Sequence, residues 1–207
     1  MMQNGTILPL NLTTTIDDWA HSPGDCHLGL LDGPAGFMKS AIACMVAEWW
    51  DHSNFLAGTF FFFQNSGDQS KVVWLVSTHV PLHSIDNPSL LNQPIKHQFQ
   101  KLIVDPIVAL PKQSHHQMII IGALDECEDH EPIQQLITFT ASVDYFKFPV
   151  NFLFTSRREE HIHKIFEFPS VNYMPYHLSL SNTTFNVHGD IKHFLWSQFS
   201  IIYQQNL

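Results

Sequence analysis

Charged side chains and cysteines are both scarce in this 207-residue chain, and each scarcity excludes a class of protein. Asp, Glu, Lys and Arg make up 14% of the residues, against roughly a quarter in ordinary soluble domains, whereas 44% are hydrophobic. A disordered chain would show the opposite balance. The three cysteines, Cys26, Cys44 and Cys127, have no C-x-x-C spacing, which argues against a disulfide framework or a zinc site.

Basic residues are few as well, and a secretory leader and long apolar runs are missing. Ten Lys and Arg stand against 19 Asp and Glu, and the resulting net charge of −9 argues against a nucleic-acid partner. The longest apolar runs, 58–63 and 118–124, are too short to span a bilayer, so no membrane partner is expected. The first residues lack the positive start and cleavage pattern of a signal peptide. These features predict a globular cytoplasmic protein of one domain.

What the chain does contain is an alternation of strand-like and helix-like segments. Short apolar or alternating runs predict strands at 27–31, 59–63, 118–124, 150–155 and 176–180, and the aromatic run 59–63 is predicted to be a buried strand. Apolar residues at helical spacing predict helices in two stretches within 71–110, at 132–145 and at 190–203, with a short charged helix ending at 165. A further helix is predicted at 40–50, with Ile42, Met45, Val46 and Trp49 on one face. Such alternation favours an α/β fold with a mainly parallel sheet covered on both faces. We expect residues 1–24 to be a linker or lead-in segment and 25–207 to be the domain.

The loop after the first predicted strand has the spacing of a phosphate-binding loop, G-x-x-x-x-G-K-S/T. Its residues are Gly33-Pro34-Ala35-Gly36-Phe37-Met38-Lys39-Ser40. In such a loop backbone N–H groups and a helix N-terminus surround a phosphate, the lysine reaches the outer phosphates, and the hydroxyl binds Mg²⁺. Met38 stands where a glycine is expected, and a side chain there crowds the phosphate and resists positive φ. An ordinary Gly-Pro turn before a helix explains the same residues.

The second motif begins with the apolar run 118–121. Gly122 comes directly after this run, and the acidic pair Asp125 and Glu126 follows. A metal-binding strand of a P-loop enzyme ends in an aspartate that holds Mg²⁺, and here Gly122 takes that place. Asp125 and Glu126 could orient a water or act as a general base. A solvated acidic loop is the alternative, because three more acidic residues follow.

The third motif is Thr155-Ser156-Arg157, which follows another apolar run. An arginine at the end of a strand can sense the γ-phosphate of a nucleotide. A helix start followed by surface charges is the alternative. Since ligands of open α/β sheets bind at the carboxyl ends of the strands, the three motifs together favour one shared site more than each does alone.

Fourteen histidines raise the question of a metal site. His161 and His163 alternate within a helix-like segment, where that spacing points them apart. Pro81 separates His79 from His83, and His115 precedes His116 in a loop. We therefore expect ordinary surface or core histidines and no histidine metal site.

The combined order of motifs resembles the NACHT domain of fungal NOD-like proteins, also called the nephrocystin-like N-terminal domain. The resemblance covers about residues 27–200. It is carried by the loop segment 30–43, the aromatic run 60–62, the segment 98–106, Ala123-Leu124-Asp125-Glu126-Cys127, Thr155-Ser156-Arg157, and the segments 177–180 and 190–191. The resemblance implies a three-layer P-loop NTPase fold of the STAND signalling class, with the sensor strand between the other two motif-bearing strands.

The resemblance also implies a site and its cofactors, ATP and Mg²⁺. Gly33, Pro34, Ala35, Gly36, Lys39 and Ser40 would bind the nucleotide, with Ser40 as a weak Mg²⁺ ligand. Asp125, Glu126 and Arg157 would be the catalytic residues. The sequence departs from the family at Met38 and Gly122, in a stretch between Phe63 and Phe99 that is about one helix shorter, and in ending before the family's further domains.

These departures leave several functions open. One is an ATP-binding signalling switch with impaired or no hydrolysis. The others are a pseudo-NTPase that acts only as a protein-interaction module and a non-functional gene fragment. The predicted helix at 190–203 carries Ile191, Phe194, Leu195, Phe199 and Ile202. We expect protein partners or self-association through this apolar face.

Overall fold

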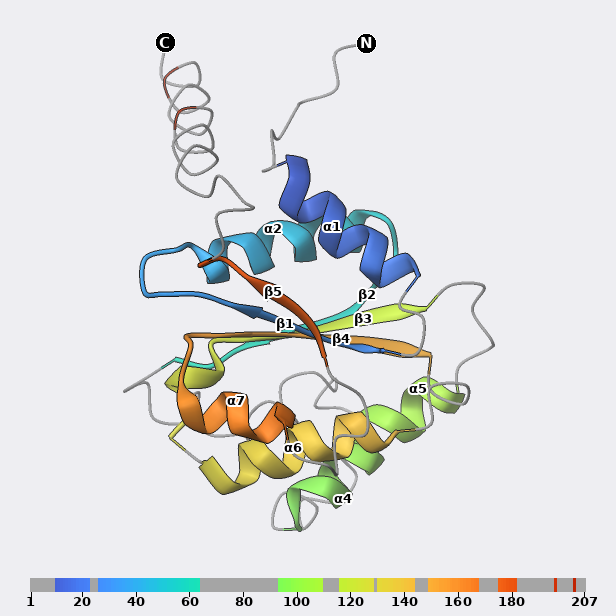
Figure 1. Ribbon diagram of the computed structural model, residues 1–207. Coiled ribbons are helices and arrows are strands. Elements are labelled where there is room, and N and C mark those ends of the chain that lie inside the picture. Colours follow the sequence, from blue (N-terminus) through green and yellow to red (C-terminus); the bar gives the residue numbers. More distant parts are fainter. Residues whose placement is uncertain are drawn as a thin grey trace.

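The computed structural model describes residues 10–22, 26–63, 93–109, 116–128, 130–143, 149–167 and 175–181, together with Trp196 and Tyr203. Five parallel strands form one sheet that lies between two layers of helices (Figure 1). The strands are β1 (Leu28–Asp32), β2 (Leu56–Phe61), β3 (Gln117–Gly122), β4 (Val150–Ser156) and β5 (Tyr176–Ser179). This arrangement confirms the predicted three-layer α/β fold of the P-loop class.

The strand order is β2-β3-β4-β1-β5, so β4 lies between β1 and β3 as the resemblance implied. Strands β1 and β4 are buried along their whole length, because they lie inside the sheet with helices on both faces. Strand β2 was predicted as a buried strand at 59–63, but it spans 56–61 and is only partly buried. The reason is its position at the edge of the sheet, which the sequence pattern does not reveal.

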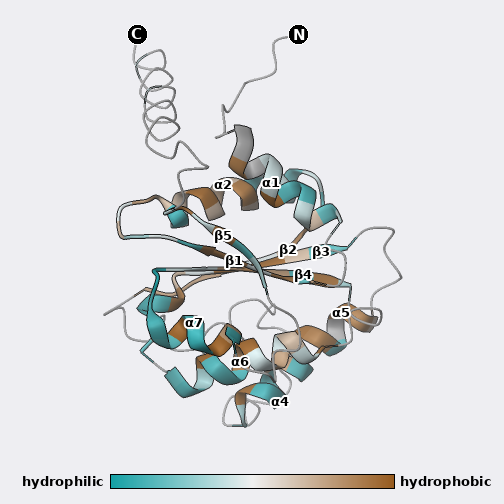
Figure 2. Ribbon diagram, viewed as in Figure 1, coloured by the Kyte–Doolittle hydropathy of each residue, from teal (hydrophilic) through white to brown (hydrophobic). Residues whose placement is uncertain are grey.

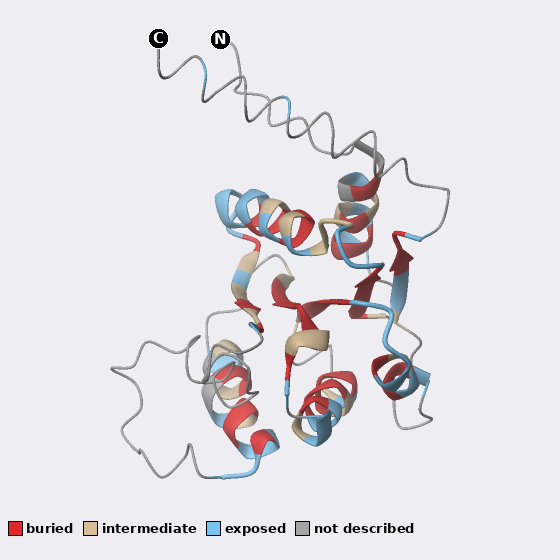
Figure 3. Cartoon of the chain, turned by 90° about the vertical axis from the view of Figure 1, so that its left-hand side faces the viewer, coloured by how far each residue is buried: buried red, intermediate tan, exposed pale blue. Residues whose placement is uncertain are grey.

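Helices α1 (Leu10–His21) and α2 (Lys39–His52) cover one face of the sheet (Figure 1). The other face is covered by α4 (Ile95–Phe99), the π-helical segment η4 (Gln100–Val104), α5 (Asp105–Ala109), α6 (His130–Ser142) and α7 (Glu160–Glu167). The inner strands β1, β3 and β4 are mostly apolar and buried, whereas the outer helix faces are polar and exposed (Figures 2 and 3). None of the helices in the described part of the chain has the length and apolarity needed to cross a bilayer.

The apolar face of α2 differs by one position from the predicted one. The spacing of Ile42, Met45, Val46 and Trp49 suggested that these residues face the core. Ile42 and Val46 are buried, but Trp49 is 39% exposed and its neighbour Trp50 is buried instead. The indole of Trp50 donates a hydrogen bond to Asp17 of α1 at 2.9 Å, which holds it under that helix.

Helix α1 lies in the segment for which a linker or a short lead-in helix was predicted, and it packs closely on the sheet. Its residues Leu12, Ile16, Trp19 and Ala20 are buried. The ring of Trp19 lies over Gly29 of β1, where an added Cβ would lie 2.7 Å from its Cη2 atom. The same ring stacks on Tyr176 of β5, with ring centroids 5.8 Å apart. The domain boundary at residue 25 itself stays a prediction. Residues 64–92, which make up most of the shortened stretch after Phe63, and most of the helix predicted at 190–203 lie outside the described residues.

Candidate functional site

The loop between β1 and α2 contains two left-handed residues. Gly36 has φ 79°, and Met38 has φ 54° and ψ 27°. Met38 directly precedes α2, and its carbonyl accepts a hydrogen bond from the N–H of Ile42 at 2.9 Å. Met38 thus adopts the positive φ that a side chain was expected to resist. A non-glycine residue in this conformation costs about 1–2 kcal/mol.

Lys39 is the first residue of α2, and its amine folds back onto the loop. The Nζ atom donates to the carbonyls of Gly33 at 2.8 Å and Pro34 at 2.9 Å. Burial lowers the pKa of the Lys39 amine below its ordinary value, and the nearby Asp125 carboxylate offsets part of this shift. Lys39 is therefore held at the loop by two neutral acceptors, which a bound phosphate would have to replace.

The end of β3 turns sharply before the acidic pair. Ala123 has φ 56°, and its N–H donates to the Thr155 hydroxyl of β4 at 3.0 Å. A short 3-10 turn, η5 (Leu124–Glu126), follows and carries the acidic pair back toward the end of β4. The sequence pattern predicts no role for the Thr155 hydroxyl. Thr155 is one of three polar residues in the buried strand β4, and its partner is known only once β3 is placed beside β4.

Asp125 and Arg157 form an ion pair across the ends of β3 and β4. The Asp125 carboxylate lies 3.0 Å from Nε of Arg157 and accepts the backbone N–H of the same residue at 2.8 Å. The side chain of Asp125 is 6% exposed, and that of Arg157 is 49% exposed. Two of the predicted catalytic residues therefore bind each other, and the carboxylate is oriented by the strand end beside it.

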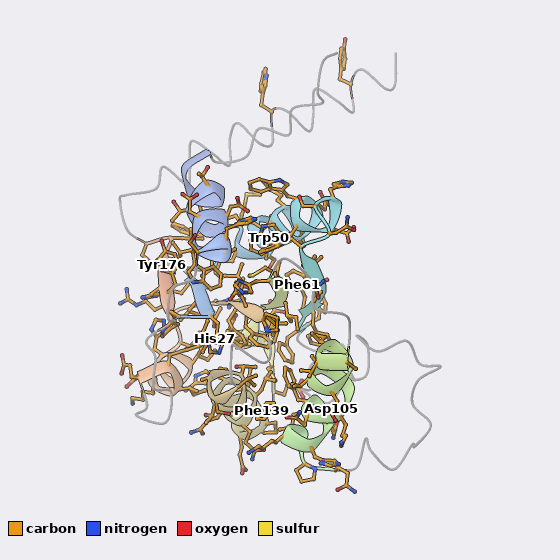
Figure 4. The ribbon with its side chains drawn as sticks, turned by 90° about the vertical axis from the view of Figure 1, so that its right-hand side faces the viewer. His27, Trp50, Phe61, Asp105, Phe139 and Tyr176 are labelled. Atoms are coloured by element: carbon orange, nitrogen blue, oxygen red, sulfur yellow. The ribbon has the colours of Figure 1, made fainter. Side chains whose placement is uncertain are left out.

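Gly122 stands where an aspartate ligand of Mg²⁺ was expected, and a side chain does not fit there. An added Cβ would lie 2.2 Å from Cδ1 of Phe61, its partner in β2. Phe61 is labelled at β2 in Figure 4, and Tyr176 at β5 marks the opposite edge of the sheet. The space for the missing carboxylate is thus occupied by an aromatic ring.

The ends of β1, β3 and β4 meet in one pocket of about 260 Å³. The predicted site residues that line it are Ala35, Gly36, Lys39, Ser40, Asp125, Glu126 and Arg157. Gly33 and Pro34 do not line it but accept the Lys39 hydrogen bonds. Three further lining residues, Met38, Ala123 and Thr155, were not among the predicted binding or catalytic groups. The pocket is slightly smaller than typical small-molecule sites of roughly 300–1,000 Å³.

Comparisons with known proteins agree with this architecture. The sequence model of the family described as "Nephrocystin 3, N-terminal" matches residues 6–157. Twenty-one chains of solved structures are significantly similar. One is the crystal structure of Cdc6p from Pyrobaculum aerophilum, with a TM-score of 0.54 and 12% identity, covering 83% of this chain and 43% of that one. No curated protein matches significantly.

The solved structure shows a likeness of fold alone, and the chain spans less than half of its length. The family match covers most of the present chain, including the loop after β1 and the ends of β3 and β4. The chain therefore belongs to the nephrocystin 3 N-terminal family and has the three-layer fold of P-loop NTPases.

Proposed function

We propose that this domain is a NACHT-type, nucleotide-binding signalling switch that binds the phosphates of ATP weakly and hydrolyses ATP slowly or not at all. The observation that carries the proposal is the convergence of three strand ends on one pocket. Lys39 and Ser40 come from the β1 loop, Asp125 from the end of β3 and Arg157 from the end of β4. This is where ligands of open α/β sheets bind.

The phosphate-binding part of the site fits this ligand. Gly36 leaves open space on its Cβ side, and the N-terminus of the 14-residue helix α2 begins at the loop. Backbone N–H groups at such a terminus favour anions. The Lys39 amine would exchange the carbonyls of Gly33 and Pro34 for phosphate oxygens, and Ser40 would offer its hydroxyl to Mg²⁺.

The metal-binding part fits less well, which supports impaired hydrolysis. At position 122 a carboxylate is absent and its space is filled by Phe61. Two carboxylates, Asp125 and Glu126, line the pocket, and Asp125 is paired with Arg157. When bound, Mg²⁺ would neutralise charge on the phosphates, a contribution of several kcal/mol to catalysis. A domain that retains Lys39 but lacks the metal carboxylate is suited to binding rather than turnover.

A second candidate is a protein-interaction module that no longer binds nucleotide. The Phe61–Gly122 packing and the internal Asp125–Arg157 pair favour it, because both stabilise the domain without a ligand. The same fold would then serve only as a surface for partners.

Calorimetric titration of the purified chain with Mg·ATP distinguishes the nucleotide-binding switch from the protein-interaction module. The switch proposal predicts measurable binding by the parent protein, abolished in Lys39→Ala and retained in Lys101→Ala, which removes an equal charge from an exposed surface site. Absence of binding by the folded parent would favour the interaction module. Binding that survives in Lys39→Ala would place the nucleotide elsewhere.

A further inference from the structure

A second polar cluster lies next to the phosphate loop, on the opposite face of the sheet from α2. Asp32 is the last residue of β1, and it shares a face with Leu28 and Leu30, since side chains alternate along a strand. Those two leucines belong to the core beneath α6 and α7. Asp32 therefore points into that core, and it is fully buried.

Two histidines from different elements face the Asp32 carboxylate. The Nε2 atom of His163 in α7 lies 3.0 Å from Oδ2, and the Nε2 atom of His177 in β5 lies 3.1 Å from Oδ1. One ligand atom from each of the three residues lies within 4.8 Å of the other two. The helical spacing of His161 and His163, which argued against a metal site, does not bear on this cluster, because its second histidine comes from β5.

These contacts are short, yet they are not hydrogen bonds. Both Asp32 oxygens and the Nε2 atom of His163 are buried without a hydrogen-bond partner. The imidazole nitrogens therefore do not direct an N–H bond or a lone pair at the oxygens beside them. Donor atoms about 3 Å apart that make no hydrogen bond with one another have the spacing of ligands around one ion.

The neighbouring strands add more unsatisfied polar atoms at the same place. Ser156 of β4 and Ser179 of β5 are the register partners of Asp32, so their side chains lie on its face of the sheet. Both hydroxyls are buried without a hydrogen-bond partner. Five of the seven such side-chain atoms in the described part of the chain thus gather around Asp32. Buried polar groups normally have partners, so this concentration indicates an additional bound species.

We propose that Asp32, His163 and His177 bind a divalent transition-metal ion, with Zn²⁺ as the best match. Imidazole and carboxylate are ligands that Zn²⁺ accepts, at about 2.0–2.2 Å. Donor atoms of a tetrahedral site with such bonds lie roughly 3.3 Å apart, close to the observed 3.0 and 3.1 Å. The ion would also compensate the buried Asp32 charge, whose ion-pair partners among the described residues are these two histidines.

The proposed metal has a structural role that is independent of nucleotide binding. It joins the end of β1, the edge strand β5 and helix α7 at one point. Asp32 directly precedes Gly33, so the ion would fix the residue from which the phosphate loop starts. His177 is 40% exposed, which leaves a route by which the ion can enter and a side on which water can complete the coordination.

The test is a titration of the metal-free chain with Zn²⁺ in the absence of nucleotide. We expect one tightly bound Zn²⁺ per chain, a rise in melting temperature with Zn²⁺ concentration, and a visible ligand-field spectrum when Co²⁺ replaces Zn²⁺. His163→Gln and His177→Gln should each weaken binding at least about tenfold, because even residues behind the ligands contribute that much. His161→Gln is the matched control. It removes an exposed histidine two positions away on α7 and should leave the affinity unchanged.

Two results would overturn the proposal. One is a folded parent that binds no Zn²⁺ and keeps its melting temperature, in which case ordered water satisfies the buried atoms. The other is equal Zn²⁺ affinity in the parent and in all three histidine variants, which would assign the ion to scattered surface histidines. The His177→Gln variant changes a side chain that is 40% exposed, so the test remains decisive if the more buried His163→Gln variant does not fold.

Discussion

Phe61 packs against the bare backbone of Gly122 so closely that the two residues fit only as a pair. A Cβ on Gly122 would lie 2.2 Å from Cδ1 and 2.4 Å from Cε1 of the ring. The two residues are direct partners in the β2–β3 register. Restoring the missing aspartate at position 122 therefore requires a change at position 61 as well.

We predict that Gly122→Asp alone destabilises the domain by about 1–3 kcal/mol, because it overpacks the space that Phe61 fills. It should not improve Mg·ATP binding. The Phe61→Ala, Gly122→Asp double variant should bind Mg·ATP more tightly than either single variant. Urea unfolding and calorimetric titration measure both effects. Gly122→Ala is the control, since it adds the Cβ without a charge and should destabilise similarly. A fully stable Gly122→Asp protein would show that the ring moves aside freely.

Met38→Gly should leave stability unchanged or raise it by up to about 1 kcal/mol. Glycine removes the left-handed strain at φ 54° but adds backbone entropy to the unfolded chain. It should also tighten Mg·ATP binding, since no side chain then lines the pocket at this position. Met38→Ala keeps the strain and serves as the control. Met38→Ala also removes most of the side chain, so an affinity that is unchanged in both variants would mean that the Met38 side chain does not limit phosphate approach.

Asp125 should matter for stability mainly through its acceptance of the Arg157 backbone N–H. Asp125→Ala leaves that donor without its acceptor and should cost about 1–3 kcal/mol. Asp125→Asn keeps an acceptor and should cost less. Arg157→Ala should cost under about 1 kcal/mol, because its side chain is half-exposed and the ion pair is screened. Chemical denaturation measures the free energy of unfolding of each variant. A larger loss of this free energy in Arg157→Ala than in Asp125→Ala would contradict the prediction.

His27 predicts a pH dependence of stability. Burial lowers the pKa of its imidazole, while the hydrogen bond from Nε2 to the Thr140 carbonyl at 2.9 Å offsets part of the shift. As pH falls below about 6.5, the unfolded chain takes up this proton before the folded chain does. The free energy of unfolding should then decrease, by at most about 1.4 kcal/mol per pH unit from this group.

The measurement is denaturant unfolding of the parent and of His27→Gln between pH 5 and pH 8. The difference between their free energies of unfolding is followed as a function of pH. Glutamine retains an N–H donor near the same place but does not titrate. The other histidines contribute equally to both curves. A difference that stays constant across this range would contradict a lowered pKa for His27.

Helix α1 should be required for stability, whatever the formal boundary of the domain. Trp19→Ala should cost about 3–5 kcal/mol, because it empties the space over Gly29 and beside Tyr176. Trp49→Ala is the control, since that side chain lies 39% exposed on α2. A melting temperature equally affected by both substitutions would argue that α1 is only loosely attached.

The sequence by itself determined the strand-helix alternation and the three motifs at strand ends, because apolar runs and turn residues are local signals. It also identified Met38 and Gly122 as departures from a working phosphate site. It could not determine which strand lies at the edge, so β2 was predicted as buried. It could not show either that Trp50 rather than Trp49 faces the core, because the two differ by only one position on the helix.

Only the tertiary structure decided which side chains meet. Phe61 reaches Gly122 because β2 and β3 pair in that register, and Thr155 accepts the Ala123 N–H because β3 and β4 are neighbours. Asp32, His163 and His177 are far apart in the chain and carry no shared spacing, so their cluster depends on β5 and α7 both packing beside β1. Local pattern fixes where strands and helices begin, whereas register and packing bring distant polar groups to the same place.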